Sequence, residues 1–264
     1  MSAGVIPRVD VLGVGISAVS MDQAVAEISR WVDEGERHYV CVTGVHGVME
    51  SQRDPALAAI HNRSGLTTPD GMPMVWAGHR AGARHMTRVY GPDLMLELCG
   101  LGATRGWSMY FYGGGEGTPE RLAERLTARF PGLKVAGTYS PPFRPLTPEE
   151  DDEVVARINE AQPDVVWVGL STPKQERWVA AHRARLHAPA IIAVGAAFDF
   201  HAGLLPQAPR WMQQRGLEWA YRLVKEPRRL WKRYLSNNPR FVAAIARRPP
   251  RLVADLTGER DKRT

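Results

Sequence analysis

The sequence predicts an α/β protein with a two-lobed, Rossmann-like parallel sheet body and a basic helical segment after it. Short apolar, β-branched runs alternate with longer amphipathic runs, and this order implies parallel strands joined by crossover helices. The run 165–170 is apolar almost throughout, which is typical of a strand buried on both faces. We therefore expect an N-terminal α/β lobe over 1–104, a Rossmann-like lobe over 105–205 and a basic helical appendage over 206–264.

Strand and helix signals follow each other along the whole predicted body. The expected strands are 8–13, 38–43, 65–68, 108–112, 133–138, 165–170 and 190–194. Capping residues and prolines open helical runs near Ser20, Asp54, Gly91, Thr118, Thr147 and Thr172. Beyond 207 the pattern predicts two or three short basic helices, one of which starts at Pro227.

Composition excludes several classes of protein. The chain has 264 residues, of which 44% are hydrophobic and 23% charged, as in ordinary globular proteins. Cys41 and Cys99 provide neither a disulfide framework nor a metal-binding spacing, so a reducing cytoplasm is expected. No signal peptide is recognised, and the longest apolar stretch, 188–198, is shorter than the ~20 residues that span a bilayer.

Charge is distributed unevenly along the chain. Residues 206–264 contain 15 Lys and Arg against 5 Asp and Glu, whereas residues 1–205 contain 19 against 23. A strongly basic segment attached to a mildly acidic body indicates a polyanionic partner. Nucleic acid, a phosphorylated ligand and an anionic membrane surface are the three candidates.

An isolated acid lies at a strand-to-helix corner. Asp70 occupies a Pro-Asp-Gly turn after a short apolar run, and Thr43 ends an earlier strand. If these strands are neighbours in a parallel sheet, the two side chains share one crevice, where α/β proteins bind their ligands. The alternative is that Asp70 only caps a helix beginning at Met72.

A glycine-rich turn, 113–117, follows the strand 108–112. Such a turn before a helix can bind phosphate through backbone N–H groups. The dinucleotide pattern would require a third glycine at position 118, which is Thr118, and no acid ends the following strand. NAD binding is therefore disfavoured, and a nucleotide-phosphate site and a purely structural turn stay open.

Other polar residues follow the later strands. Gln175 is either a site residue or the partner of Thr172 in a capping box, and Asp199 is either a site residue or a turn former. His46 and His201 lack partners at metal-binding spacing. The chain contains no Asp-X-Asp motif, so we expect no metal and assign the neutralisation of a diphosphate to Arg and Lys.

Several motifs together resemble one protein family, the WecG/TagA/CpsF glycosyltransferases, from Val9 to about Tyr234. The motifs are PDGMPMVWAGHRAG, RVYGPDLM, YFYGGGEGTPERL, SPPFRPL, VGLSTPKQERW, VGAAFDFHAG and APRWMQQRGLEWAYRLVKEPRR. The resemblance implies a two-lobed α/β body with a C-terminal appendage that completes the site. It also implies inverting transfer of a sugar, often N-acetylmannosamine or its uronic acid, from a UDP donor to a sugar on undecaprenyl diphosphate. The products of the family are teichoic acid, enterobacterial common antigen or other surface polysaccharides.

The resemblance also assigns roles to residues. Asp70 matches the family's candidate base, and Thr43 matches a threonine at the same strand end. The positions that match donor-pocket or cationic appendage residues are Arg88, Gln175, Asp199, Arg222, Arg229, Lys232 and Arg233. No cofactor is implied. Where the family usually has Thr-X-Asn, this chain has Thr43-Gly44-Val45, so a sugar-binding amide is missing and a different hexose donor is an alternative.

The sequence thus predicts a cytoplasmic glycosyltransferase that binds peripherally to the inner, anionic membrane surface. Its expected partners are a UDP-sugar and a polyprenyl-diphosphate-linked sugar, with homo-oligomerisation possible. Two other classes stay open on the residues alone: a nucleic-acid-binding protein that uses the basic segment, and a nucleotide-binding oxidoreductase. Trp and Leu at helical spacing in the segment suit a membrane interface or packing against the body, and both are alternatives to nucleic-acid binding.

Overall fold

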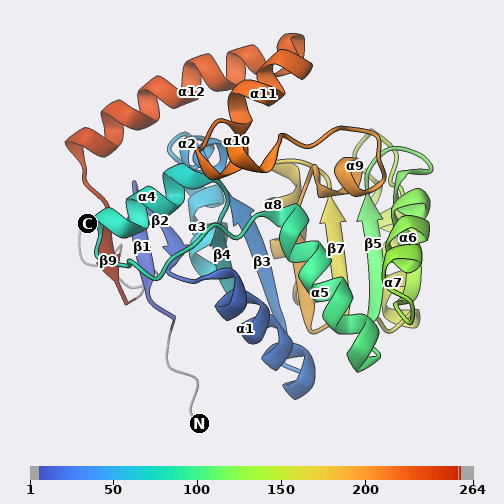
Figure 1. Ribbon diagram of the computed structural model, residues 1–264. Coiled ribbons are helices and arrows are strands. Elements are labelled where there is room, and N and C mark those ends of the chain that lie inside the picture. Colours follow the sequence, from blue (N-terminus) through green and yellow to red (C-terminus); the bar gives the residue numbers. More distant parts are fainter. Residues whose placement is uncertain (1–5, 255, 257–264) are drawn as a thin grey trace. The chain divides into compact units, whose positions relative to one another are not determined.

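The computed structural model describes residues 6–254 and 256, and it confirms the predicted α/β class. The larger of two sheets has six strands in the order β4-β3-β8-β7-β5-β6 (Figure 1). The pairs β3–β8, β7–β8, β5–β7 and β5–β6 are parallel. The strands are β3 (His38–Thr43), β4 (Leu66–Pro69), β5 (Ser108–Gly113), β6 (Lys134–Tyr139), β7 (Val165–Gly169) and β8 (Ala190–Ala193).

The chain forms two compact units, and each draws on distant parts of the sequence. Unit 1 comprises residues 1–24, 42–90 and 207–264, and unit 2 comprises residues 25–41 and 91–206. The basic C-terminal segment therefore belongs to the same unit as the Thr43 and Asp70 corner. The division of the chain at residues 104 and 205 stays a prediction.

Unit 1 contains a small antiparallel sheet in the order β2-β1-β9. Its strands are β1 (Arg8–Val11), β2 (Val14–Ser17) and β9 (Arg251–Val253). The sequence predicted one strand over 8–13, but the chain reverses at Leu12 and Gly13, whose φ angles are 57° and 86°. The prediction of helices alone after residue 207 was incomplete, because β9 pairs with β1.

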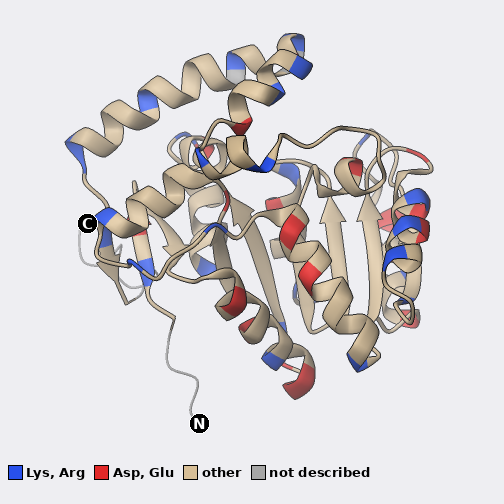
Figure 2. Cartoon of the chain, viewed as in Figure 1, with Lys and Arg blue, Asp and Glu red and all other residues tan. Residues whose placement is uncertain are grey.

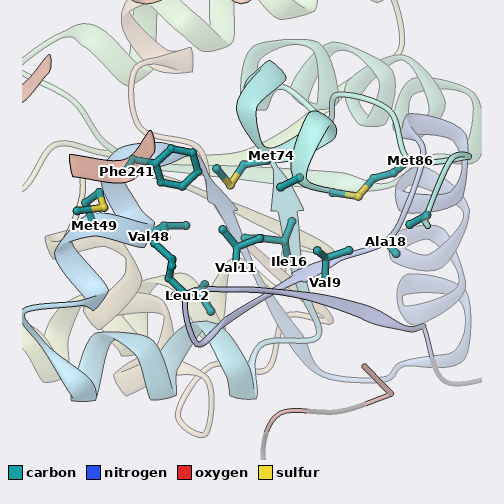
Figure 3. Close-up of a cluster of buried hydrophobic side chains, with 13 residues drawn as sticks. Val9, Val11, Leu12, Ile16, Ala18, Val48, Met49, Met74, Met86 and Phe241 are labelled. Carbon is teal, nitrogen blue, oxygen red and sulfur yellow. The ribbon is translucent and has the colours of Figure 1, made fainter. Parts of the chain in front are cut away.

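The hydrophobic core of unit 1 combines the β1–β2 hairpin with three helical regions (Figure 3). Val11 and Ile16 of the hairpin are fully buried, as is Met74, and Phe241 of the last helix is 7% exposed. The helices of the unit are α2 (Val45–Ser51), α3 (Pro55–Arg63), α4 (Met72–Arg80), α10 (Arg210–Gln214), α11 (Glu218–Lys225) and α12 (Pro227–Arg247). The latter part of α12 is thus built into the core.

Polar contacts also fix the end of α12. The buried Asn237 amide lies 3.2 Å from Nδ1 of His46 and accepts a hydrogen bond from Arg53 Nη2 at 3.3 Å. Beyond the helix, Arg248 Nη2 donates to Asp10 Oδ2 of β1 at 2.7 Å. In Figure 1 the helix runs directly into the strand β9. The C-terminal segment is therefore anchored at its far end.

Unit 2 holds most of the parallel sheet and the helices that cover it. Its helices are α5 (Gly91–Arg105), α6 (Thr118–Arg129), α7 (Pro148–Glu160), α8 (Lys174–His182) and α9 (Ala197–His201), and α1 (Met21–Glu34) enters it from unit 1. The capping box predicted at Ser20 is confirmed, because Ser20 N donates to Gln23 Oε1 at 2.9 Å. The four residues from Val165 to Val168 are fully buried, as the apolar run predicted.

Candidate active site

The backbones of Thr43 and Asp70 meet at the ends of β3 and β4. The backbone N–H of Asp70 donates to the carbonyl oxygen of Thr43 at 2.9 Å. A Cβ atom on Gly44 would lie 2.7 Å from the Asp70 carbonyl oxygen, so a residue without a side chain is needed for this close approach. Helix α4 is capped by Gly71 without a side-chain hydrogen bond, and the alternative of Asp70 as the cap is wrong.

Arg88 lies beside this corner. Its Nη2 atom is 4.0 Å from Oδ1 of Asp70, whose side chain is 35% exposed. The N–H of Val89 donates to the carbonyl oxygen of Pro69 at 3.0 Å, which holds the Arg88 segment against the end of β4. The guanidinium carbon also lies 3.8 Å from the ring centre of Tyr90, in cation–π contact. The structure therefore brings Asp70 and Arg88 together.

Two residues of the C-terminal segment also contact Arg88. Glu218 of α11 pairs with Arg88 through Nη2 and accepts a hydrogen bond from the Tyr90 hydroxyl at 3.0 Å. Gln213 of α10 accepts from Arg88 Nη1 at 3.0 Å. These partners were not predicted from the sequence, although Glu218 is the one acid between residues 206 and 225.

The carboxylates of Asp70 and Glu218 affect the pKa values of Arg88 and Tyr90. Burial alone would lower the pKa of Arg88, but the carboxylates of Asp70 and Glu218 outweigh it and raise the pKa. Burial raises the pKa of Tyr90, and the same two carboxylates raise it further. Arg88 is therefore a permanent cation and Tyr90 a neutral donor, with two carboxylates facing one guanidinium.

Thr43 contacts a buried histidine. Its Oγ1 atom lies 3.2 Å from Nδ1 of His61, and the His61 side chain is fully buried. Burial, together with the charge of Arg8, lowers the pKa of His61 to about 4. The imidazole is thus neutral at pH 7, and it orients the Thr43 hydroxyl without adding charge to the corner.

Unit 2 contains a second polar corner, at the start of α8 after β7. Gln175 is 3% exposed, and α8 is capped by Pro173 without a side-chain hydrogen bond, so the capping-box alternative is wrong. Its Nε2 atom donates to Oε1 of Glu176 at 3.2 Å. Its Oε1 atom is buried, and nothing in the described part of the chain hydrogen-bonds to it. Buried acceptors are normally satisfied, so this oxygen fits the N–H group of a ligand.

The other predicted residues lie in helices. Asp199 lies in the short helix α9 rather than in a loop, and it is partly exposed. Arg222 of α11 is 3.9 Å from Glu226, and the exposed Lys232 lies 5.5 Å from the ring centre of Trp231. Arg229 and Arg233 belong to α12, but their side chains lie outside the described part of the structure. The roles of all these residues, and that of Gln175 in the donor pocket, stay predictions.

The glycine-rich turn is held by a side chain of unit 2. The Ser140 hydroxyl lies within hydrogen-bond distance of the carbonyl oxygens of Gly114 and Gly115, at 3.1 and 2.6 Å.

His201 contacts the Pro92 carbonyl oxygen at 2.8 Å. Over residues 6–254 and 256, no group of three His, Cys, Asp or Glu side chains is arranged to hold a metal ion.

The comparison with known proteins decides the family of the chain. A model of the glycosyl transferase WecG/TagA/CpsF family matches residues 9–253. The chain belongs to this family. The match covers both units and extends through β9, so the resemblance seen in the motifs is confirmed and the activity is glycosyl transfer.

Three curated relatives of the chain share one protein name. A Bacillus subtilis (strain 168) protein is 31% identical over 83% of this chain and 86% of its own length. A Bacillus spizizenii protein is 27% identical over 81% of each chain, and a Staphylococcus aureus (strain MW2) protein is 26% identical over 91% of this chain and 92% of its own. Each is an N-acetylglucosaminyldiphosphoundecaprenol N-acetyl-β-D-mannosaminyltransferase.

Proposed function

We propose that this glycosyltransferase moves an N-acetylmannosamine-type hexose from UDP to the sugar of an undecaprenyl-diphosphate-linked acceptor, with inversion at the anomeric carbon. The product would serve the synthesis of teichoic acid or a related surface polysaccharide. The names of the curated relatives support the donor and acceptor. The observation that carries the chemistry is the partly exposed Asp70 carboxylate beside Arg88 at the end of β4.

Asp70 would act as the general base. An acceptor hydroxyl is a weak nucleophile, and a carboxylate that accepts its proton raises its reactivity in the transition state. The acceptor oxygen would then form a bond to the anomeric carbon while the bond from that carbon to the UDP oxygen breaks. The proton ends on Asp70 and the electron pair leaves with UDP, so one displacement inverts the configuration.

Cationic and amide groups would hold the donor. Charge develops on the leaving diphosphate, and fixed cations stabilise it as it forms. Arg88 is one such cation, and the predicted ones on the C-terminal segment are Arg222, Arg229, Lys232 and Arg233. In unit 2, we assign the buried carbonyl oxygen of Gln175 to an N–H group of the donor, and we assign Asp199 to donor binding as well.

One position bears directly on the identity of the donor sugar: Val45 stands where the family usually has an amide. Val45 packs against the core of unit 1 and cannot accept a hydrogen bond. The test is UDP release from a panel of UDP-hexoses in the presence of the lipid acceptor. We expect the fastest release with UDP-N-acetylmannosamine. Release that is faster with a hexose lacking the acetamido group would replace the donor, and no release from any UDP-sugar would reject the function.

We further propose that the C-terminal segment docks on the anionic inner membrane surface. The largest share of exposed apolar side chains in the described residues lies on α10 to α12: Trp211, Leu217, Trp219, Val224, Trp231, Leu235 and Val242. Lys225 and Arg215 extend over the rings of Tyr221 and Trp211, and Figure 2 shows Lys and Arg recurring along α11 and α12. Aromatic and basic side chains together suit the membrane interface. In the described residues no helix is long and apolar enough to cross a bilayer.

Liposome sedimentation tests this docking. Replacing the exposed Lys225, Arg228 and Arg240 by Gln removes three charges, each worth ~1 kcal/mol near an anionic surface, so we expect binding to weaken about 100-fold. The matched control replaces three exposed basic residues of unit 2, Arg121, Arg129 and Lys134. Equal sedimentation of the two variants would reject the C-terminal segment as the docking surface.

A further inference from the structure

The C-terminal segment brings a carboxylate into the candidate active site, which a purely cationic segment would not do. We infer that Glu218 is a positioning residue that holds the Arg88 guanidinium beside Asp70. Through this contact, the packing of the C-terminal segment on the rest of unit 1 affects the geometry around the base. This inference rests on the proposed function, in which Asp70 is the base and Arg88 a cation of the donor pocket.

Contacts on three sides determine the position of Arg88. Glu218 and Gln213 accept hydrogen bonds from Nη2 and Nη1, and the Tyr90 ring supports the face of the guanidinium. Tyr90 also donates to Glu218 at 3.0 Å, so Glu218 links both groups. The Arg88 side chain is only 14% exposed and that of Glu218 only 16%, which strengthens their interaction relative to one in water.

Asp70 competes with Glu218 for the same guanidinium. The Arg88 Nη2 atom is 4.0 Å from Asp70, which exceeds hydrogen-bond distance, whereas it is hydrogen-bonded to Glu218. A direct hydrogen bond from Arg88 would stabilise the charged form of Asp70 and make it a weaker proton acceptor. Glu218 therefore keeps the cation close enough to act on a donor and away from a direct bond with the base.

The turn before α11 fixes where Glu218 is presented. Gly216 has a φ of +70°, and a Cβ atom there would lie 2.9 Å from the ring of Trp76 and 3.2 Å from Cβ of Met72. Met72 opens α4 directly after Asp70 and Gly71. The segment thus packs closely on the helix that follows the base, while Phe241 and β9 anchor its far end. Glu218 lies between these two attachments.

The first test is the Glu218→Gln variant of the full chain, which keeps the shape and removes the charge. We expect kcat to fall about 10- to 100-fold, since small displacements of active-site groups have effects of this size, with little change in the donor KM. The acid limb of the pH dependence of kcat should shift to lower pH. Glu218→Asp should restore part of the loss. The matched control is Glu50→Gln, which breaks the 2.8 Å pair of Glu50 with Arg53 in the same unit and should leave kcat unchanged.

The second test needs no substrate and follows backbone amide hydrogen exchange. In Glu218→Gln, exchange over residues 210–225 should be about tenfold faster, because a charge-assisted hydrogen bond is lost, while exchange in β1 and β9 should not change. Faster exchange with unaltered kcat would make Glu218 a structural contact only, and unaltered exchange would reject the coupling; either overturns the inference. If the wild-type chain transfers no sugar, the proposed function fails instead, and the exchange result still reports on the contact.

Discussion

Two corners of the molecule, one in each unit, follow parallel strands but differ in chemistry. The corner after β4 has two carboxylates around Arg88, and its Asp70 side chain is 35% exposed. In the corner after β7, the uncharged Gln175 residue is only 3% exposed and lies beside the buried Glu176. The Asp70 carboxylate can exchange a proton with a bound hydroxyl, whereas the Gln175 carboxamide can only donate and accept hydrogen bonds.

This difference suggests a division of labour. A general base must be accessible to its substrate, and neighbouring charges must control its protonation. The Asp70 corner would meet both requirements, the second with the help of Glu218. A recognition group benefits from burial, because an unsatisfied buried acceptor penalises every ligand that lacks the matching donor. Chemistry and donor recognition would then respond differently to substitution.

The largest effect is expected for Asp70→Asn. The change keeps the shape of the side chain and removes the proton acceptor, so kcat should fall about 10²- to 10⁴-fold while UDP affinity is nearly unchanged. Turnover and calorimetric titration with UDP measure the two quantities. Asp22→Asn, at an exposed position in the first turn of α1, is the control. A variant that retains most of its turnover would show that Asp70 is not the base.

A smaller effect is expected for Gln175→Met. The apolar side chain has a similar length but accepts no comparable hydrogen bond, so kcat/KM should fall about 10- to 100-fold, mainly through a higher donor KM. Steady-state kinetics with varied donor concentration measures the change. The melting temperature must be compared as well, because Gln175 also donates to Glu176. A fall in kcat alone would place Gln175 in the chemical step.

His61 affects stability more than activity, and its effect depends on pH. Its pKa is about 4 in the folded protein and 6.5 in the unfolded reference, so below pH 6.5 the unfolded state binds the proton more readily. Its contribution is fully present above pH 6.5 and is lost as the pH falls toward 4, by up to about 3 kcal/mol. Urea unfolding of the wild type and His61→Gln at pH 7 and pH 4.5 measures it. Equal losses in the two proteins would contradict a neutral buried His61.

The smallest effect is expected for removal of divalent ions. The chain lacks an Asp-X-Asp motif, and basic side chains are assigned to the diphosphate, so EDTA should leave the rate of transfer unchanged. The measurement is UDP release with EDTA, followed by addition of Mg²⁺ or Mn²⁺. Activity that is lost with EDTA and returns with either ion would overturn this expectation.

The sequence predicted the sheet and one half of the Asp70 corner because both depend on local patterns. Apolar runs located β7 and β8, and parallel strand ends placed Asp70 next to Thr43. The reversal at Leu12 and Gly13 was missed because leucine rarely adopts a positive φ, and a single glycine in an apolar run is a weaker hairpin signal than a pair such as Asn-Gly. Strand β9 was missed because three residues are too few to show a period.

The contacts of Arg88 could not be predicted in the same way. Glu218 is 130 positions away from Arg88, and no periodicity relates residues at such a distance. An isolated acid in a basic segment was the available signal, but an acid there could equally pair with a neighbouring arginine, as Glu226 does with Arg222. Which arginine an acid pairs with depends on how the fold brings distant segments together, and a single sequence does not show this.

Single-turnover transfer at saturating donor tests the division of labour most directly. With UDP-N-acetylmannosamine raised far above its KM, the Gln175→Met variant should approach the wild-type rate, because the defect lies in binding. The Asp70→Asn variant should stay about 10²- to 10⁴-fold slower at every donor concentration. Recovery of the Asp70 variant at saturation, or a Gln175 variant that stays equally slow, would contradict the account.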